Sequence, residues 1–158
     1  MFAASVPVAL QALDQAQVLL DKTPPTLMSA RLAPGMFDLS EQFGIVAGFA
    51  LRATYPLVGR DVPKLEGDPA TRLLRVRILT DDLAEADFIG AAERQITHRA
   101  GFADLTQSGE DYLKHFALPN LWFHLSMIYA ILRANGVDVG KADFDGLHSY
   151  PDGFVFED

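Results

Sequence analysis

The stretch from Pro119 to Ala134 limits the fold of this chain more than any other segment. Residues 121–132 are apolar nearly all round a helix, and a helix of that kind is buried by its neighbours. Asn135-Gly136 is a typical helix end. The apolar run is shorter than the roughly 18–20 residues needed to span a bilayer, so it predicts a helix at the centre of a packed core and no membrane segment.

Three further segments repeat apolar residues at helical spacing. The first covers residues 5–22, with Ser5 as the expected N-cap and an end at Pro24-Pro25. The second covers residues 38–57. The third follows Asp68-Pro69, a typical pair of N-cap and first helical residue. Together with residues 119–134, these patterns predict an all-α, up-and-down four-helix bundle.

The remaining segments lack a sustained period. Residues 87–108 are expected to form an ordered loop, although Arg94–His98 alternates weakly, as in a short strand. The tail from Gly140 is rich in aromatic residues and is expected to be irregular and to wrap one end of the bundle. A chain of 158 residues and 17.3 kDa is the size of one domain, so residues 1–158 are predicted to form a single domain.

The charge and the N-terminal sequence restrict the partners and the compartment. A net charge of −8 argues against general binding to nucleic acid, and the cluster Arg72, Arg75 and Arg77 is interpreted as a solvated helix face. Residues 1–7 lack the basic leader of a secretory signal. The chain contains no cysteine, which is compatible with a reducing compartment, and the cytoplasm is therefore expected.

Polar residues interrupt three of the apolar stripes, namely Gln17, Gln42 and His124. A buried amide or imidazole must be hydrogen-bonded, solvated in a pocket or bound to a ligand, because burial without a partner costs a few kcal/mol. The candidate ligand pocket comprises these three residues and the neighbouring Trp122. For His124 three roles stay open: a structural histidine whose hydrogen-bond partners lie within the protein, a residue of a ligand pocket and a metal ligand.

A metal site would need several histidines or carboxylates at short range. His124 and His115 are the candidate ligand pair, with zinc or nickel as the candidate metal. The residue four positions after His124 is Ile128, so the second ligand that a helix usually supplies is missing. His98 and His148 fall in predicted loops, where exposure is expected.

Three segments closely resemble a bacterial family known as the domain of unknown function 1993. They are residues 30–37 (ARLAPGMF), residues 116–124 (FALPNLWFH) and the stretch from Tyr129 to Val137 (YAILRANGV) with 140–144 (GKADF). The family is grouped with the DinB/YfiT-like superfamily of metalloenzymes. This resemblance implies a four-helix bundle that is often dimeric, and it extends over nearly the whole chain.

The superfamily typically carries three histidine ligands, one early in the second helix and a His-x-x-x-His pair on the last. By resemblance, Gln42 lies near the position of the first, His124 matches one member of the pair, and Ile128 replaces the other. The catalytic residues are therefore unknown. The leading hypothesis is a bundle that binds a small ligand in a central pocket. The alternatives are a metal-dependent enzyme of the thiol-transferase or hydrolase type and a structural homodimer.

Overall fold

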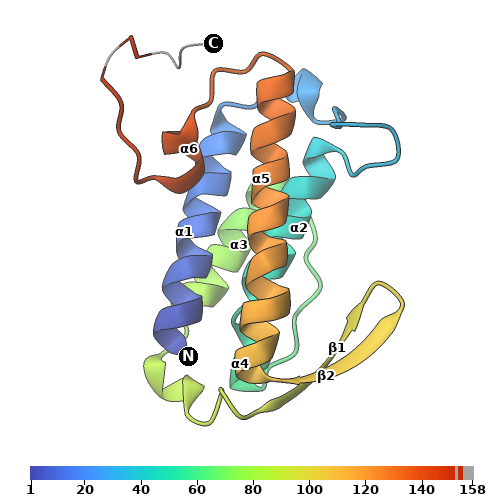
Figure 1. The fold of residues 1–158 in the computed structure, drawn as a ribbon, viewed down its shortest axis with the longest axis vertical. Coiled ribbons are helices and arrows are strands. Elements are labelled where there is room, and N and C mark those ends of the chain that lie inside the picture. The colour runs from blue at the N-terminus through green and yellow to red at the C-terminus, as the bar shows by residue number, and fades with distance from the viewer. Residues whose placement is uncertain (152, 155–158) are drawn as a thin grey trace.

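The computed structural model describes residues 1–151, 153 and 154; Asp152 and the end of the aromatic tail, residues 155–158, lie outside the described part. Four long helices pack side by side around one hydrophobic core (Figure 1): α1 (Phe2–Asp21), α2 (Leu39–Arg52), α3 (Pro69–Asp81) and α5 (Leu118–Ala134). α2 packs against α1, α3 and α5. Within the described residues, no helix has both the length and the apolar character needed to cross a membrane.

Of the four predicted helix starts, those of α2, α3 and α5 are correct to within one residue. Asp68 accepts a hydrogen bond from the Thr71 backbone N–H at 2.8 Å, which stabilises the first turn of α3. Asp38 and Glu41 form a capping box at the start of α2. The prediction for Ser5 is wrong: this residue is buried within α1, where its hydroxyl donates to the Met1 carbonyl at 3.0 Å.

Shorter helical segments connect the long ones. The predicted second helix ends at Arg52 rather than at residue 57, and a 3₁₀ turn, Tyr55–Val58, follows. Pro56 cannot donate the backbone hydrogen bond that a continuing α-helix needs. Two further 3₁₀ turns cover Pro25–Leu27 and Glu85–Phe88.

The prediction of an all-α bundle is wrong because an antiparallel β-hairpin lies within residues 87–108. Strand β1 (Gln95–Ala100) pairs with β2 (Ala103–Ser108), with Thr97 opposite Thr106. Gly101 opens the two-residue turn at φ +61°, the conformation that a type II′ hairpin turn requires at this position. The hairpin projects from one end of the helices (Figure 1). His98, expected to be exposed in a loop, is a partly buried residue of β1.

A π-helical turn precedes α5. The short helix α4 (Gly109–Tyr112) continues through the π turn Leu113–Ala117 into α5. Pro119 has no N–H for the ladder, and the side chain of the next residue, Asn120, donates to the Phe116 carbonyl at 2.8 Å. Wide turns of this type are frequent at functional sites, and this one brings Phe116 to the cleft described below.

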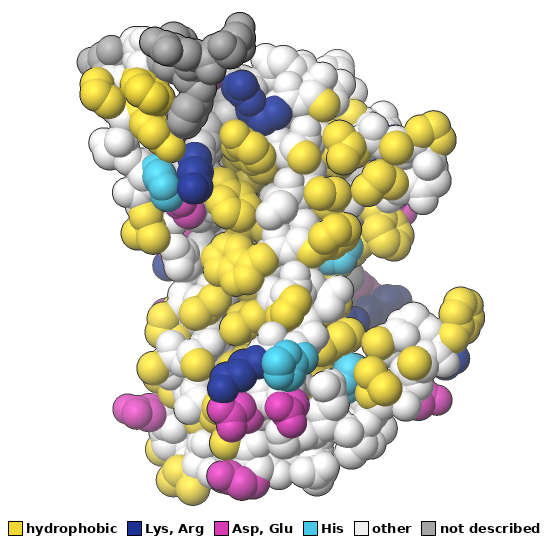
Figure 2. Space-filling view, in the orientation of Figure 1, with side chains coloured by type: hydrophobic (Ala, Val, Ile, Leu, Met, Phe, Trp, Pro, Cys, Tyr) yellow, Lys and Arg dark blue, Asp and Glu magenta, His cyan; other side chains and the backbone are white. Residues whose placement is uncertain are grey.

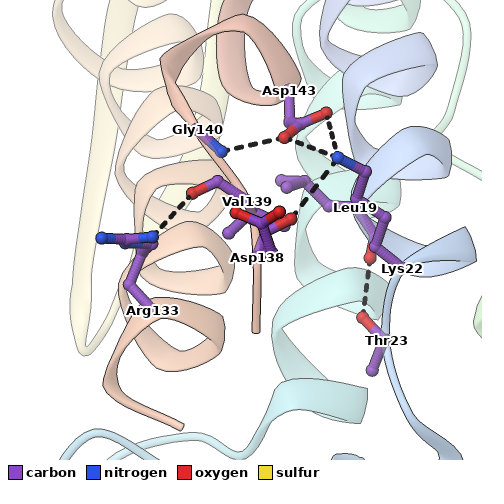
Figure 3. Close-up of polar contacts among 8 residues, drawn as sticks. All are labelled: Leu19, Lys22, Thr23, Arg133, Asp138, Val139, Gly140 and Asp143. Atoms are coloured by element: carbon purple, nitrogen blue, oxygen red, sulfur yellow. Dashed lines mark hydrogen bonds and ion pairs between the residues drawn. The ribbon is translucent and has the colours of Figure 1, made fainter. Parts of the chain in front are cut away.

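The segment after α5 is partly helical, which corrects the prediction of an irregular tail. It contains the short helix α6 (Lys141–Asp145), which packs against α1. Figure 3 shows the contacts that hold it: the Lys22 ammonium reaches both carboxylate oxygens of Asp143, at 2.8 and 2.9 Å, and Val139 is buried beneath. The same carboxylate accepts from the Gly140 N–H at 2.8 Å and thereby starts α6.

Candidate functional site

A cleft of about 1080 Å³ opens beside α2. Its walls come from α2, from the start of α5, from the connection at residues 62–65 and from the hairpin turn at Arg99–Gly101. Figure 2 shows the outline of the molecule hollowed above the hairpin, with Lys or Arg side chains visible in the hollow. The volume slightly exceeds the range of about 300–1,000 Å³ that is typical of small-molecule sites, so the cleft has room for such a ligand.

His124 and Gln42 meet at the buried side of this cleft. The His124 Nδ1 lies 2.7 Å from the Gln42 Oε1, and the exposed fractions of the two residues are 8% and 1%. Because an amide oxygen only accepts hydrogen bonds, Nδ1 is the protonated nitrogen of the ring. In the neutral imidazole, Nε2 therefore carries the lone pair, and no described residue donates a hydrogen bond to it.

Burial keeps this imidazole neutral. Removal from water lowers the pKa of His124 below its ordinary value of 6.5, because a charged ring loses more hydration than a neutral one. At neutral pH the ring therefore presents a hydrogen-bond acceptor, and not a cation, to any group that binds beside it.

Aromatic rings surround His124. Phe49 stacks on it, with 5.7 Å between ring centroids and an interplanar angle of 16°, and Phe37 lies at 6.3 Å. Phe116 packs edge-on against Phe49 at 5.6 Å. All three line the cleft, so the wall beside the imidazole is apolar and aromatic.

Beyond Phe116 lies a second histidine. The His98 ring is 4.1 Å from that of Phe116 and 4.9 Å from that of Tyr112. Its Nε2 donates to the Gln107 Oε1 across the hairpin at 2.7 Å. Burial raises the pKa of Tyr112 to about 12, and nearby Arg52 partly opposes this shift. These contacts fasten the hairpin to α4 and so fix one wall of the cleft.

The structure brings together two of the four predicted pocket residues. Gln17 bonds to Asp21 at 2.7 Å and lies in a separate groove between α1 and α3. Trp122 packs towards Phe144 of α6, with 6.1 Å between the rings, and does not line the cleft. The binding roles of Gln42 and His124 stay predictions.

The residues around His124 do not fit the metal site that the superfamily implies. His115 is exposed beside Asp111 and lines no part of the cleft, while Ile128, one turn beyond His124, is fully buried and apolar. The Nδ1 of His124 is already bonded to an amide. Within residues 1–151, 153 and 154, no group of three His, Cys, Asp or Glu residues is arranged to hold a metal ion.

Sequence reasoning missed the aromatic wall and the arginines of the cleft. The sequence pattern did not single out Phe49, and Arg72 was interpreted only as part of a solvated helix face. The available signal was the pair Gly44 and Gly48, one helical turn apart. In the structure the lack of side chains at these two glycines allows the guanidinium groups of Arg72 and Arg52, rather than a neighbouring helix backbone, to lie against α2.

Comparisons with known proteins agree with this architecture. Curated proteins include no match to the chain. A crystal structure of a DinB family member from Shewanella denitrificans is similar, with a TM-score of 0.83 and 28% sequence identity over 95% of this chain and 94% of that one. Residues 1–145 match the family described as "Domain of unknown function (DUF1993)". The chain therefore belongs to the DUF1993 family and has a DinB-like fold.

Proposed function

We propose that this protein binds a small molecule in the cleft beside α2, with the Nε2 of His124 accepting a hydrogen bond from it. The observation that supports this most is the Gln42–His124 contact, because it fixes the ring tautomer and leaves the acceptor nitrogen without a partner among the described residues. Phe49, whose ring stacks on that of His124, adds apolar surface beside it. The compartment we propose is a bacterial cytoplasm.

A neutral aromatic amide tests this proposal. 3-Phenylpropionamide offers a ring for the aromatic wall and an N–H for Nε2. For a ligand of this size, a dissociation constant of ~1 mM is expected. Titration into ¹⁵N-labelled protein should shift the backbone NMR signals of residues that line the cleft, such as Gly48, Phe49 and Asn120.

Two histidine variants give the matched comparison. His124→Phe keeps an aromatic ring but removes the acceptor, and should weaken binding by roughly 3- to 10-fold. His115→Phe changes an exposed histidine outside the cleft and should leave binding unchanged. No saturable shifts at cleft residues, or equal binding by His124→Phe and the wild type, would contradict the proposal.

Homodimerisation is a second candidate function, favoured by the exposed apolar residues of α3. Leu74 and Ile78 lie one turn apart and are 60% and 61% exposed, so they share a helix face. Sedimentation velocity at increasing concentration should show a monomer–dimer equilibrium that Leu74→Glu/Ile78→Glu abolishes. A wild-type chain that remains monomeric at every concentration would contradict this candidate.

A further inference from the structure

Two guanidinium groups lie against a bare stripe of α2. A Cβ atom at Gly44 would be 2.7 Å from the Arg72 Nη1, and one at Gly48 would be 2.8 Å from the Arg52 Nη1. Four helical residues rise about 6 Å, so the two charged groups contact α2 at positions one helical turn apart. Both arginines line the cleft that contains His124.

Neither arginine has an acidic partner in the described part of the chain. Arg31, Arg60, Arg77 and Arg99 each approach an aspartate, whereas Arg52 lies over the Phe49 ring at 5.1 Å. The Nε of Arg72 is buried without a hydrogen-bond acceptor. A buried donor without an acceptor is costly, so the protein leaves this guanidinium group poorly satisfied, and an anion at its Nη atoms would add hydrogen bonds that the protein does not supply.

The other charges in the cleft are also mainly positive. Lys64 and Arg99 also line it, although each approaches a carboxylate outside the lining, Glu66 and Asp104 respectively, and Glu41 is the acidic residue among the lining side chains. The Glu41 carboxylate already accepts the Asp38 N–H at 2.8 Å. A locally positive cleft on a chain of net charge −8 attracts a negatively charged ligand against the general field of the protein.

From these contacts we infer that the ligand carries a carboxylate or phosphate group that binds between Arg52 and Arg72, with its aromatic or apolar body against Phe49. Guanidinium groups suit both anions because their N–H donors match paired oxygens. The inference rests on the proposed function, since it assigns a ligand class to the same cleft.

Matched probes distinguish the binding of any small molecule in the cleft from a specific preference for an anion. 3-Phenylpropionate differs from 3-phenylpropionamide only at the anionic group, and phenyl phosphate replaces the planar anion by a tetrahedral one. Each is titrated into the labelled protein at low ionic strength. One or both anions should bind about tenfold or more tightly than the neutral amide, and the tighter one identifies the preferred anion.

Glutamine variants test the two arginines. Arg52→Gln and Arg72→Gln should each remove most of the preference for the anion while leaving the affinity for the amide within about twofold. Arg75→Gln is the control, because Arg75 lies on the same helix as Arg72 but outside the cleft. Thermal unfolding of each variant shows whether it is folded.

The results of these titrations test the anion site separately from the proposed small-molecule binding. Equal binding of the amide and both anions at cleft residues would overturn the anion site and leave the proposed function standing. A preference for anions that survives in both arginine variants would also overturn it. No binding of any probe in the cleft would contradict the proposed function itself.

Discussion

Gln42 and His124 are 82 positions apart in the chain and share a buried hydrogen bond of 2.7 Å. The bond joins α2 to α5, the helix whose apolar sequence places it in the core. One side of the His124 ring is thus fixed by the protein, and the residue also lines the cleft.

Replacing Gln42 by leucine should destabilise the fold by about 1–3 kcal/mol, because it leaves the Nδ1–H of His124 buried without an acceptor. The double variant Gln42→Leu/His124→Phe should recover part of this loss, since both polar groups are then gone. Urea unfolding measures each free energy. Gln17→Leu is the control, because that amide lies outside the site, and should cost less than about 0.5 kcal/mol. An additive double-variant cycle would contradict a coupled pair.

The stability should depend on pH through His124. Because its pKa is lowered in the folded state, the unfolded chain binds the proton more readily, and the contribution of His124 is fully present above pH 6.5. This contribution falls as the pH drops from 6.5 towards the folded pKa. Unfolding free energies of wild type and His124→Phe, compared between pH 5 and 8, should diverge in slope below pH 6.5. Parallel curves would mean that the ring is not desolvated.

Gly109 should tolerate no side chain. A Cβ atom at this position would overlap the backbone carbonyl oxygen of Ala91, so Gly109→Ala must move the start of α4 and with it the π turn that places Phe116. The expected loss is about 2 kcal/mol or more. Gly140→Ala is the control, because nothing lies within 4 Å of its Cβ position. Thermal unfolding that gives equal midpoints for the two variants would contradict this packing.

Metal retention should be low. The protein, purified without an affinity tag and dialysed after loading with zinc or nickel, should retain less than about 0.1 metal ion per chain, because a real site holds its ion near stoichiometry. Elemental analysis of wild type and His124→Phe should therefore agree. Stoichiometric zinc or nickel that disappears in His124→Phe would restore the metalloenzyme alternative.

The sequence predicted the existence of the four long helices, because three combine apolar residues at helical spacing with a local start or stop signal and the fourth is a nearly continuous apolar run. Asp68-Pro69 and the apolar run after Pro119 are local signals that tertiary packing left unchanged. Family resemblance added the DinB-like architecture, which periodicity alone could not specify.

The hairpin could not be predicted with confidence from its own residues. β2 reads Ala103–Ser108 and is largely exposed, without the β-branched alternation of a half-buried strand. Its pairing depends on the turn at Gly101 and on contacts between His98 and the helical residues Tyr112 and Phe116. These contacts join residues of different segments, and a single sequence does not indicate which segments will pack together.

The candidate site was partly predictable from the sequence. Gln42 and His124 stand out as polar residues within apolar stripes, and burial forces such residues to find partners. Gln17 gave the same signal, but its stripe borders a different groove. The arginines of the cleft were not predicted as site residues. Residue spacing indicates the helix face on which a side chain begins, but the charged end of a long arginine side chain can lie well away from that face.

The most direct test is the ¹⁵N NMR spectrum of the histidine side chains during titration with 3-phenylpropionamide at pH 7.5. His124 should be in the Nδ1–H tautomer before addition, and its Nε2 resonance should shift saturably as the amide binds, while His115 should not respond. An Nε2–H tautomer, or an Nε2 resonance that stays constant while cleft residues respond, would contradict the role assigned to His124.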